Sequence, residues 1–234
     1  PFSIKMCGFG TDWIKAAAEN AASQDEETHV LDNALIIFAK NPVLGKVKTR
    51  LAKTIGDAAA FDAYQEMLAH VRNVAMQVDC HRIVFYSDFV DEVDAWSRPE
   101  FSKEVQTGAD IGEKMHNALA STLAKGFSKV VLVGCDLLDL QVQHLKQAFR
   151  SLEFHDIVIG PADDGGYYLI GMKAPDPSLF FDKSWSHAKV LTNTLADIQK
   201  QGKSVQLVAQ LSDIDDENDW DAALERQRLR LAKT

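Results

Sequence analysis

Short, continuous apolar runs alternate along this chain with stretches of helical periodicity. The runs lie at residues 34–39, 82–86, 130–133 and 157–159, with further candidates at residues 167–172 and 205–208. Helical periods lie between and after them, at residues 58–77, 111–125, 142–152, 189–201 and 218–232. Continuous apolar runs of this length are typical of strands buried on both faces, as in a parallel sheet. Strands that alternate with helices indicate βαβ units, so we expect a three-layer α/β domain.

The first part of the chain does not follow this pattern. Residues 16–22 are rich in alanine, an acidic group follows at residues 25–27, and residues 12–22 could form a short helix. We therefore expect an N-terminal extension of unknown role over residues 1–32 and one domain over residues 33–234. Hydrophobic residues make up 46% of the chain and charged residues 25%, which excludes disorder as its main state.

Charge and cysteine content narrow the partners and the compartment. The formal net charge of −9 makes the chain a poor general binder of duplex nucleic acid or anionic membrane. The three cysteines are far apart and form no CxxC pair, which favours reduced thiols and a cytoplasmic location. No apolar run is long enough to span a bilayer, and the first thirty residues do not have the pattern of a signal peptide. The oligomeric state is not predicted.

A cluster of basic residues follows the first apolar run. Residues 40–50 contain Lys40, Lys46, Lys48 and Arg50, with Gly45 among them. Ligands of open α/β sheets bind outside the carboxyl ends of the strands, where helix N-termini also attract anions. Gly45 would permit a sharp turn or a close approach to a phosphate. These residues are therefore a candidate phosphate site, with a solvated basic loop as the alternative.

A carboxylate follows the third strong apolar run. Residues 131–136 read VLVGCD, so Asp136 comes directly after an apolar strand, Gly134 and Cys135. Mg²⁺ is typically held by one or two carboxylates together with ligand phosphates, which makes Asp136 a candidate metal ligand. The alternative is that Asp136 caps the next helix, although Asp139 could do so instead.

Two acidic residues and two glycines separate the next pair of expected strands. Asp163, Asp164, Gly165 and Gly166 form a turn signal that needs no function by itself. The turn nevertheless follows a buried strand of the same sheet, and paired glycines allow a ligand to approach closely. We leave the hairpin and the ligand site as equal alternatives on this evidence.

Two further segments carry weaker signals. Gly108 precedes Asp110 at an expected helix start, where capping explains Asp110 and a nucleotide base or ribose contact is the alternative. Residues 212–220 are acidic and lie ahead of the last helix, where they complement the helix dipole. Spacing alone favours this dipole role over a metal site.

Several of these segments together resemble a known family. The most specific matches are residues 39–51 (AKNPVLGKVKTRL) and 160–171 (GPADDGGYYLIG), with weaker ones at residues 108–115, 134–136, 185–186 and 213–215. They resemble a bacterial glycosyltransferase-A-like family of the nucleotide-diphospho-sugar transferase superfamily, some members of which are assigned to arsenosugar biosynthesis. The superfamily also contains 2-phospholactate guanylyltransferase and the molybdenum cofactor nucleotidyltransferases.

The resemblance implies a fold, a cofactor and site residues. It implies the glycosyltransferase-A fold, a three-layer α/β/α domain with a mainly parallel sheet. It also implies a nucleotide on the basic loop and Mg²⁺ or Mn²⁺ on Asp136, with Asp215 as a second metal carboxylate. Asp163, Asp164, Gly165 and Gly166 would face the acceptor. Trp185 resembles the first residue of a family Trp-Ser pair and would wall the acceptor pocket, with core packing as the alternative.

Three functions remain open on this basis. The leading one is a metal-dependent glycosyltransferase that uses a nucleotide-diphospho-sugar and a small-molecule acceptor, with Asp163 or Asp164 as catalytic base. The second is a nucleotidyltransferase that uses a nucleoside triphosphate and releases pyrophosphate. The third is a non-catalytic nucleotide-binding module. It is suggested because Cys135, Leu137 and Leu138 occupy positions where the family usually has serine before the metal aspartate and proline soon after.

Overall fold

The computed structural model describes residues 31–97 and 99–232. The strands in these ranges are β1 (Leu31–Ala39), β2 (His81–Tyr86), β3 (Ser102–Val105), β4 (Phe127–Gly134), β5 (Ile157–Pro161), β6 (Tyr167–Met172) and β7 (Val205–Leu207). The helices are α2 (Thr49–Ile55), α3 (Asp57–Ala75), α4 (Ile111–Ala124), α5 (Val142–Phe154), α6 (Val190–Lys200) and α7 (Glu217–Leu231), with a 3-10 turn at Pro177–Leu179. Most of the N-terminal extension expected over residues 1–32, including its candidate helix, lies outside the described residues.

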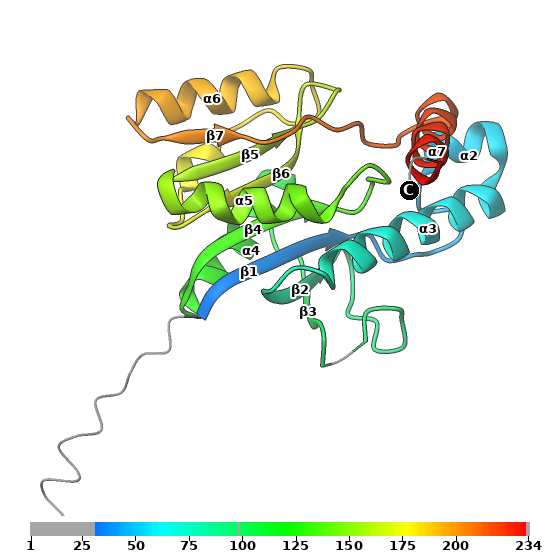
Figure 1. Ribbon diagram of the computed structural model, residues 1–234, viewed down its shortest axis with the longest axis horizontal. Coiled ribbons are helices and arrows are strands. Elements are labelled where there is room, and N and C mark those ends of the chain that lie inside the picture. The colour runs from blue at the N-terminus through cyan, green and yellow to red at the C-terminus, as the bar shows by residue number, and fades with distance from the viewer. Residues whose placement is uncertain (1–30, 98, 233–234) are drawn as a thin grey trace, which may run out of the picture. The chain divides into compact units, whose positions relative to one another are not determined.

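The strands form one sheet in the order β3-β2-β1-β4-β6-β5-β7 (Figure 1). Strand β6 runs antiparallel to both of its neighbours, β4 and β5, and every other pairing in the sheet is parallel. The carboxyl ends of the six parallel strands therefore meet at one edge, together with the start of β6. This arrangement confirms the mainly parallel sheet expected from the sequence.

Helices cover both faces of the sheet. On β1, Leu35 and Ile37 pack in a core with residues of α2, α3, α5 and α7, while Ala34 and Ile36 pack in a second core with α4 and α6. Burial on both faces explains why β1 reads as a continuous apolar run instead of an alternating one. The expected three-layer α/β/α architecture is confirmed.

Strand β3 and helix α2 were not expected from the sequence. Strand β3 is polar because it lies at the sheet edge and because Lys103 within it makes a buried ion pair with Asp94, with 2.7 Å between Nζ and Oδ1. Gly56 ends α2 at a positive φ of 85° and separates it from α3. Because α2 begins at Thr49, Arg50 belongs to a helix instead of the predicted loop.

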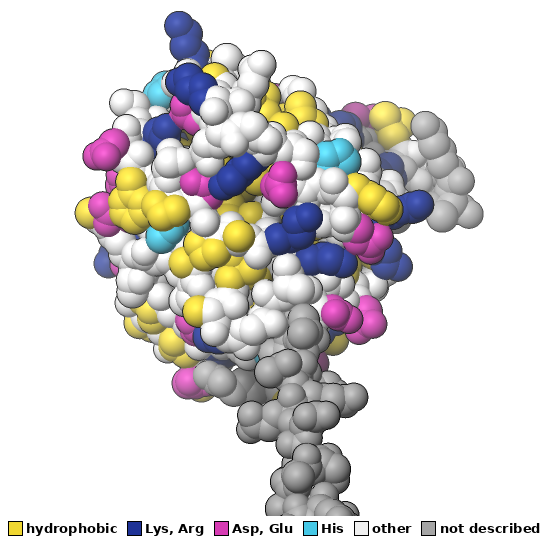
Figure 2. Space-filling view, turned by 90° about the vertical axis from the view of Figure 1, so that its left-hand side faces the viewer, with side chains coloured by type: hydrophobic (Ala, Val, Ile, Leu, Met, Phe, Trp, Pro, Cys, Tyr) yellow, Lys and Arg dark blue, Asp and Glu magenta, His cyan; other side chains and the backbone are white. Residues whose placement is uncertain are grey.

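The surface carries both signs of charge. Figure 2 views the molecule from the side on which β1 begins, and there Lys and Arg side chains are interspersed with Asp and Glu. None of the helices within residues 31–97 and 99–232 combines the length and apolar character that a membrane crossing needs.

Candidate active site

Three neighbouring cavities lie along the carboxyl edge of the sheet. The basic cavity, of about 200 Å³, is lined by Lys40, Val47, Lys48, Thr49, Arg50, Tyr64, Asp136 and Asp215. The central cavity, of about 360 Å³, shares Lys40, Tyr64 and Asp136 with it. The acidic cavity, of about 250 Å³, shares Tyr167, Tyr168 and Asp213 with the central cavity and adds Asp164, Gly166 and Trp185. Shared lining residues make the three one continuous candidate site.

Lys48 is the buried cation of the basic cavity. Its side chain is only 6% exposed, and its Nζ lies 2.8 Å from Oδ2 of Asp136 and donates a hydrogen bond to the Ile214 carbonyl. The backbone of Lys48 is left-handed, with φ of 47°, where it caps the start of α2. Lys48 therefore ties the basic loop to the end of β4 and to the segment that precedes α7.

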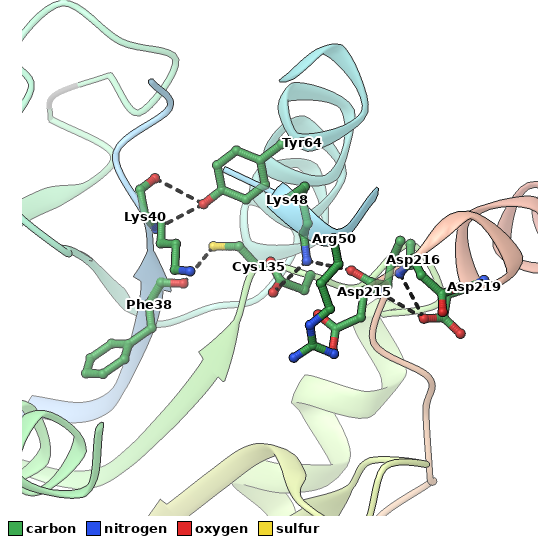
Figure 3. A network of polar contacts seen from close by, with 11 residues as sticks. Phe38, Lys40, Lys48, Arg50, Tyr64, Cys135, Asp215, Asp216 and Asp219 are labelled. Carbon is green, nitrogen blue, oxygen red and sulfur yellow. Dashed lines mark hydrogen bonds and ion pairs between the residues drawn. The ribbon is translucent and has the colours of Figure 1, made fainter. Parts of the chain in front are cut away.

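Arg50 and Asp215 form the outer part of this cavity (Figure 3). The Arg50 Nη1 atom lies 2.9 Å from Oδ2 of Asp215, and the Arg50 side chain is 71% exposed. An exposed ion pair of this kind contributes little to stability and can exchange partners. Arg50 is therefore able to turn toward an anionic ligand.

The structure separates the predicted phosphate residues into two groups. Lys40, Lys48 and Arg50 line the basic cavity. Lys46 is exposed, and it is not one of the described residues that line the three cavities. Gly45 lies in a turn with a φ of 75°, and a Cβ built on it would face Asp57. The backbone conformation therefore explains why glycine is found at this position.

Tyr64 holds the start of the basic loop from α3. Its hydroxyl accepts a hydrogen bond from the Lys40 amide at 2.9 Å and donates one to the Lys40 carbonyl at 3.0 Å (Figure 3). Burial raises the pKa of Tyr64 well above its usual value, and the nearby Cys135 and Asp136 add to this. Tyr64 therefore remains a neutral clamp at the junction of the basic and central cavities.

Asp136 and Asp139 do not cap the helix that follows them. Helix α5 begins at Val142 with Gln141 as its N-cap, and Asp139 forms ion pairs with Arg226 and Arg230. The capping alternatives considered for Asp136 and Asp139 are therefore wrong. Cys135 is buried and donates a hydrogen bond to the Phe38 carbonyl, while Asp136 turns toward the cavities.

The acidic segment ahead of α7 divides into two roles. Asp216 accepts hydrogen bonds from the Asn218 and Asp219 amides and caps the helix, as the dipole interpretation predicts. Asp215 does not cap; it faces Arg50 in the basic cavity. Asp213, to which the sequence analysis gave no role, lines both the central and the acidic cavities. The sequence signal for Asp213 is its spacing of two residues from Asp215. Because Ile214 between them is fully buried, the two aspartates face away from the core.

Asp213 has an unusual electrostatic environment. Burial raises its pKa to about 6, and the negative charge of Asp164 contributes further. A hydrogen bond from its own backbone acts in the opposite direction, and no other side chain among the described residues forms a hydrogen bond or ion pair with its carboxylate.

Asp163 and Asp164 point into different cavities. Asp163 accepts hydrogen bonds from Ser212 and Gln210, which lower its pKa, and it lines a separate cavity beside Arg226. Asp164 accepts a hydrogen bond from the Gly166 amide, at 2.7 Å, as its one partner within the described ranges, and it lines the acidic cavity. The structure therefore brings Asp164, and not Asp163, together with the other candidate residues.

The two glycines of this turn also differ. A Cβ on Gly165 would lie 2.2 Å from the Ala188 carbonyl oxygen, and its φ is 88°, so this glycine is required by the protein's own backbone. Gly166 lines the acidic cavity. Trp185 also lines the acidic cavity. Its indole packs closely against the start of α4, since a Cβ on Gly112 would lie only 2.4 Å from it. Trp185 therefore packs against the protein, as the alternative expected, and also lines a cavity; its role toward an acceptor stays a prediction.

Gly108 and Asp110 have structural explanations at the start of α4. Asp110 accepts a hydrogen bond from the Glu113 amide at 2.9 Å and is the N-cap. A Cβ on Gly108 would lie 2.7 Å from the Glu113 side chain. Neither residue lines any of the three cavities; their neighbours Gln106 and Ile111 line the central one.

The carboxylates of the basic cavity suit a metal ion only in part. No group of three or more His, Cys, Asp or Glu side chains in the described ranges could hold a metal ion. Asp136 and Asp215 each form an ion pair through one carboxylate oxygen, Oδ2. The other oxygen, Oδ1, has no partner among the described residues. Because Mg²⁺ commonly takes one or two carboxylates and completes its shell with ligand phosphates, this donor pair fits a site that a nucleotide would complete.

Solved structures with the same fold are numerous. The "putative nucleotide-diphospho-sugar transferase" of Desulfovibrio desulfuricans G20 is 29% identical, with a TM-score of 0.74 over 79% of this chain and 82% of that one. The inositol-1-phosphate CTP transferase of T. maritima is 14% identical, with a TM-score of 0.56 over 83% and 96%. CMP:2-keto-3-deoxy-manno-octonic acid synthetase, solved with CTP, is 12% identical, with a TM-score of 0.52 over 86% and 99%. A search of curated proteins found no match.

The fold and the arrangement of cavities define the class of protein. The chain has the nucleotide-diphospho-sugar transferase fold, as its resemblance predicted, and is classed with the transferases. Within this class it belongs to the family described as "Uncharacterized protein conserved in bacteria (DUF2064)", which matches residues 70–187.

Proposed function

We propose that the chain is a glycosyltransferase that binds a nucleotide-diphospho-sugar across these cavities and transfers the sugar to a small-molecule acceptor. The observation that carries the proposal is the separation of charge along one sheet edge. Lys40, Lys48 and Arg50 gather at the end beside β1. Asp164 and Asp213, which have no ion-pair partner among the described residues, line the cavity at the other end. A molecule with a diphosphate at one end and sugar hydroxyls at the other matches this polarity.

The basic cavity would take the diphosphate. Lys48 and Arg50 would stabilise the charge that develops on the leaving nucleoside diphosphate, which is the largest contribution such a site can make. Asp136 and Asp215 would hold Mg²⁺ or Mn²⁺, which would supply further positive charge there. The central cavity is lined by Phe38, Gln106, Ile111 and Lys114 among others, and would offer apolar walls, an amide and a further cation to the nucleotide.

Asp164 is the proposed base toward the acceptor. It lines the acidic cavity, and among the described residues its carboxylate is bound by the Gly166 amide alone, so it could accept a proton from an acceptor hydroxyl. Asp163, the other candidate from the sequence, is left out because Ser212 and Gln210 occupy it. The cytoplasmic location expected from the dispersed cysteines is part of this proposal.

Nucleotidyl transfer is the second candidate. Three cations around one cavity are also sufficient for the longer phosphate chain of a nucleoside triphosphate. An acceptor phosphate would then attack the α-phosphorus and pyrophosphate would leave.

Product analysis distinguishes these reactions. The protein is incubated with Mn²⁺ and a panel of nucleotide sugars or nucleoside triphosphates, together with a mixture of small acceptors. Release of nucleoside diphosphate with a glycosylated product supports the proposal, whereas release of pyrophosphate supports the second candidate. Nucleotide binding without turnover would leave a non-catalytic binding module, and Arg50→Ala serves as the control for specific release.

A further inference from the structure

The acidic cavity is lined by carboxylates and aromatic rings. Its carboxylates are Asp164 and Asp213, its walls include the aromatic rings of Tyr167, Tyr168 and Trp185, and the imidazole of His187 also lines it. Neither lysine nor arginine lines it within the part of the chain that the structure describes. The basic cavity, at the other end of the same sheet edge, has Lys40, Lys48 and Arg50.

The carboxylates of the acidic cavity have no ion-pair partner among the described residues. Asp136 and Asp215 of the basic cavity are each paired with a cation, at 2.8 and 2.9 Å. Asp164 accepts only a backbone amide, and the half-buried Asp213 has no side-chain partner among the described residues. A phosphate or carboxylate entering this cavity would meet two like charges, the exposed Asp164 and the half-buried Asp213, and burial makes the repulsion from Asp213 stronger than it would be in water.

The aromatic walls favour a different type of ligand. Tyr167 and Trp185 meet edge to face, with ring centroids 6.4 Å apart, and both line the cavity. Aromatic faces attract cations, and they provide apolar area for the carbon skeleton of a ligand. Carboxylates accept hydrogen bonds from hydroxyl and ammonium groups. The cavity therefore suits a compact compound that carries hydroxyl groups, with or without a positive charge.

We infer that the acceptor of the proposed transferase is an uncharged or positively charged hydroxyl compound, and that Asp164 and Asp213 exclude phosphorylated and carboxylated acceptors. The inference rests on the proposed function, because it assigns the acceptor to the acidic cavity. It makes these two residues determinants of acceptor charge in addition to any role in the reaction.

A matched set of three sugars tests this inference. Glucose, glucosamine and glucose 6-phosphate share a ring and differ in charge, being neutral, cationic and anionic. Each is titrated into the protein saturated with a nucleoside diphosphate, and binding is followed by tryptophan fluorescence. Trp185→Phe identifies the part of the signal that comes from the cavity.

We expect glucosamine and glucose to bind at least tenfold more tightly than glucose 6-phosphate. In Asp164→Asn the difference should shrink at least threefold, because one of the two repelling charges is gone. Asp163→Asn changes the adjacent residue, which faces another cavity, and should leave the order intact. Asp213→Asn provides a second variant if the turn at Asp164 is disturbed.

Tightest binding of glucose 6-phosphate, equal binding of the three sugars, or no binding of any would overturn the inference. The nucleoside diphosphate is titrated separately, without sugar. Failure of that titration would count against the proposed function, so the two failures are distinguishable.

Discussion

The basic and acidic cavities lie on the same sheet edge but differ in whether their carboxylates are ion-paired. In the basic cavity each carboxylate faces a cation, Asp136 with Lys48 and Asp215 with Arg50. In the acidic cavity Asp164 and Asp213 feel each other's charge, and no lysine or arginine of the described residues lines it. The paired end is electrostatically satisfied before a ligand arrives, whereas the unpaired end is not.

This difference shows where the fold tolerates unfavourable electrostatics. An unpaired, half-buried carboxylate costs stability, so its presence requires support from the surrounding packing. Here the support comes from the turn at Gly165, which packs directly against Ala188, and from Trp185 over the start of α4. The acidic end is therefore the part of the site that we expect to be most sensitive to changes in packing.

The largest expected effect is on this packing. Gly165→Ala should destabilise the protein by roughly 3 kcal/mol, because the methyl group meets the Ala188 carbonyl oxygen and φ is unfavourable. The matched control is Gly126→Ala, where φ is 97° but nothing lies within 4 Å of the new Cβ, and we expect about 1 kcal/mol. Urea unfolding measures both. Equal losses would show that the close approach to Ala188 does not support the turn.

The next effect concerns metal at the basic end. Nucleotide affinity of the wild type should rise at least tenfold, or about 1.4 kcal/mol, from EDTA to Mn²⁺, because Asp136 repels a bare diphosphate and attracts one through a cation. Asp136→Asn should lose most of this dependence, and Asp215→Asn less of it. Calorimetric titration checks the three proteins. The same metal dependence in wild type and Asp136→Asn would remove Asp136 from the proposed metal site.

An effect of similar size is expected at the junction of the basic and central cavities. Tyr64→Phe removes two hydrogen bonds to the Lys40 backbone and should cost about 1–2 kcal/mol in unfolding free energy. Nucleotide affinity should fall by less than in Lys48→Ala, since the phenol positions the loop but does not carry its charge. If Tyr64→Phe weakens nucleotide binding without loss of stability, the phenol contacts the ligand instead.

The smallest effect is a pH dependence at the acidic end. The pKa of Asp213 is about 6 in the folded protein, above the usual carboxyl value. Between about pH 4 and pH 6 its carboxyl group is therefore protonated in the folded state and ionised in the unfolded state. Stability therefore falls as pH rises through this window.

Replacing Asp213 removes this term. The stability of Asp213→Asn relative to wild type should improve by about 1 kcal/mol between pH 4 and pH 7, after allowance for solvent screening. Urea unfolding in EDTA at the two pH values measures it. A difference that does not change with pH would mean that Asp213 is well solvated.

Strands and helices with strong apolar patterns were predictable from the sequence, and β3 was not. Central strand β1 is buried on both sides and reads as apolar from Ala34 to Ala39. Strand β3 reads Ser-Lys-Glu-Val because it pairs only with β2, and its Lys103 is buried through an ion pair with a residue outside the sheet. Sequence patterns report burial, so a strand whose buried residue is charged escapes them.

The site was predictable by position but not by side-chain direction. The basic loop, Asp136 and Asp164 lie at the sheet edge where strand ends were expected to meet. Nothing in the adjacent pair Asp163 and Asp164 shows which of them Ser212 and Gln210 will bind. Lys46 and Lys48 differ in the same way, since tertiary packing buries one and leaves the other in solvent.

The central claim is that a nucleotide binds at the basic end, and two exposed cations of one segment test it most directly. A nucleoside diphosphate is titrated, with Mn²⁺, into wild type, Arg50→Ala and Lys46→Ala, and into Asp164→Asn from the acidic end. Arg50 lines the basic cavity and Lys46 does not, so only Arg50→Ala should weaken binding, by about 1.5–3 kcal/mol or roughly tenfold to a hundredfold. Equal losses in Arg50→Ala and Lys46→Ala, or a larger loss in Asp164→Asn, would contradict the account.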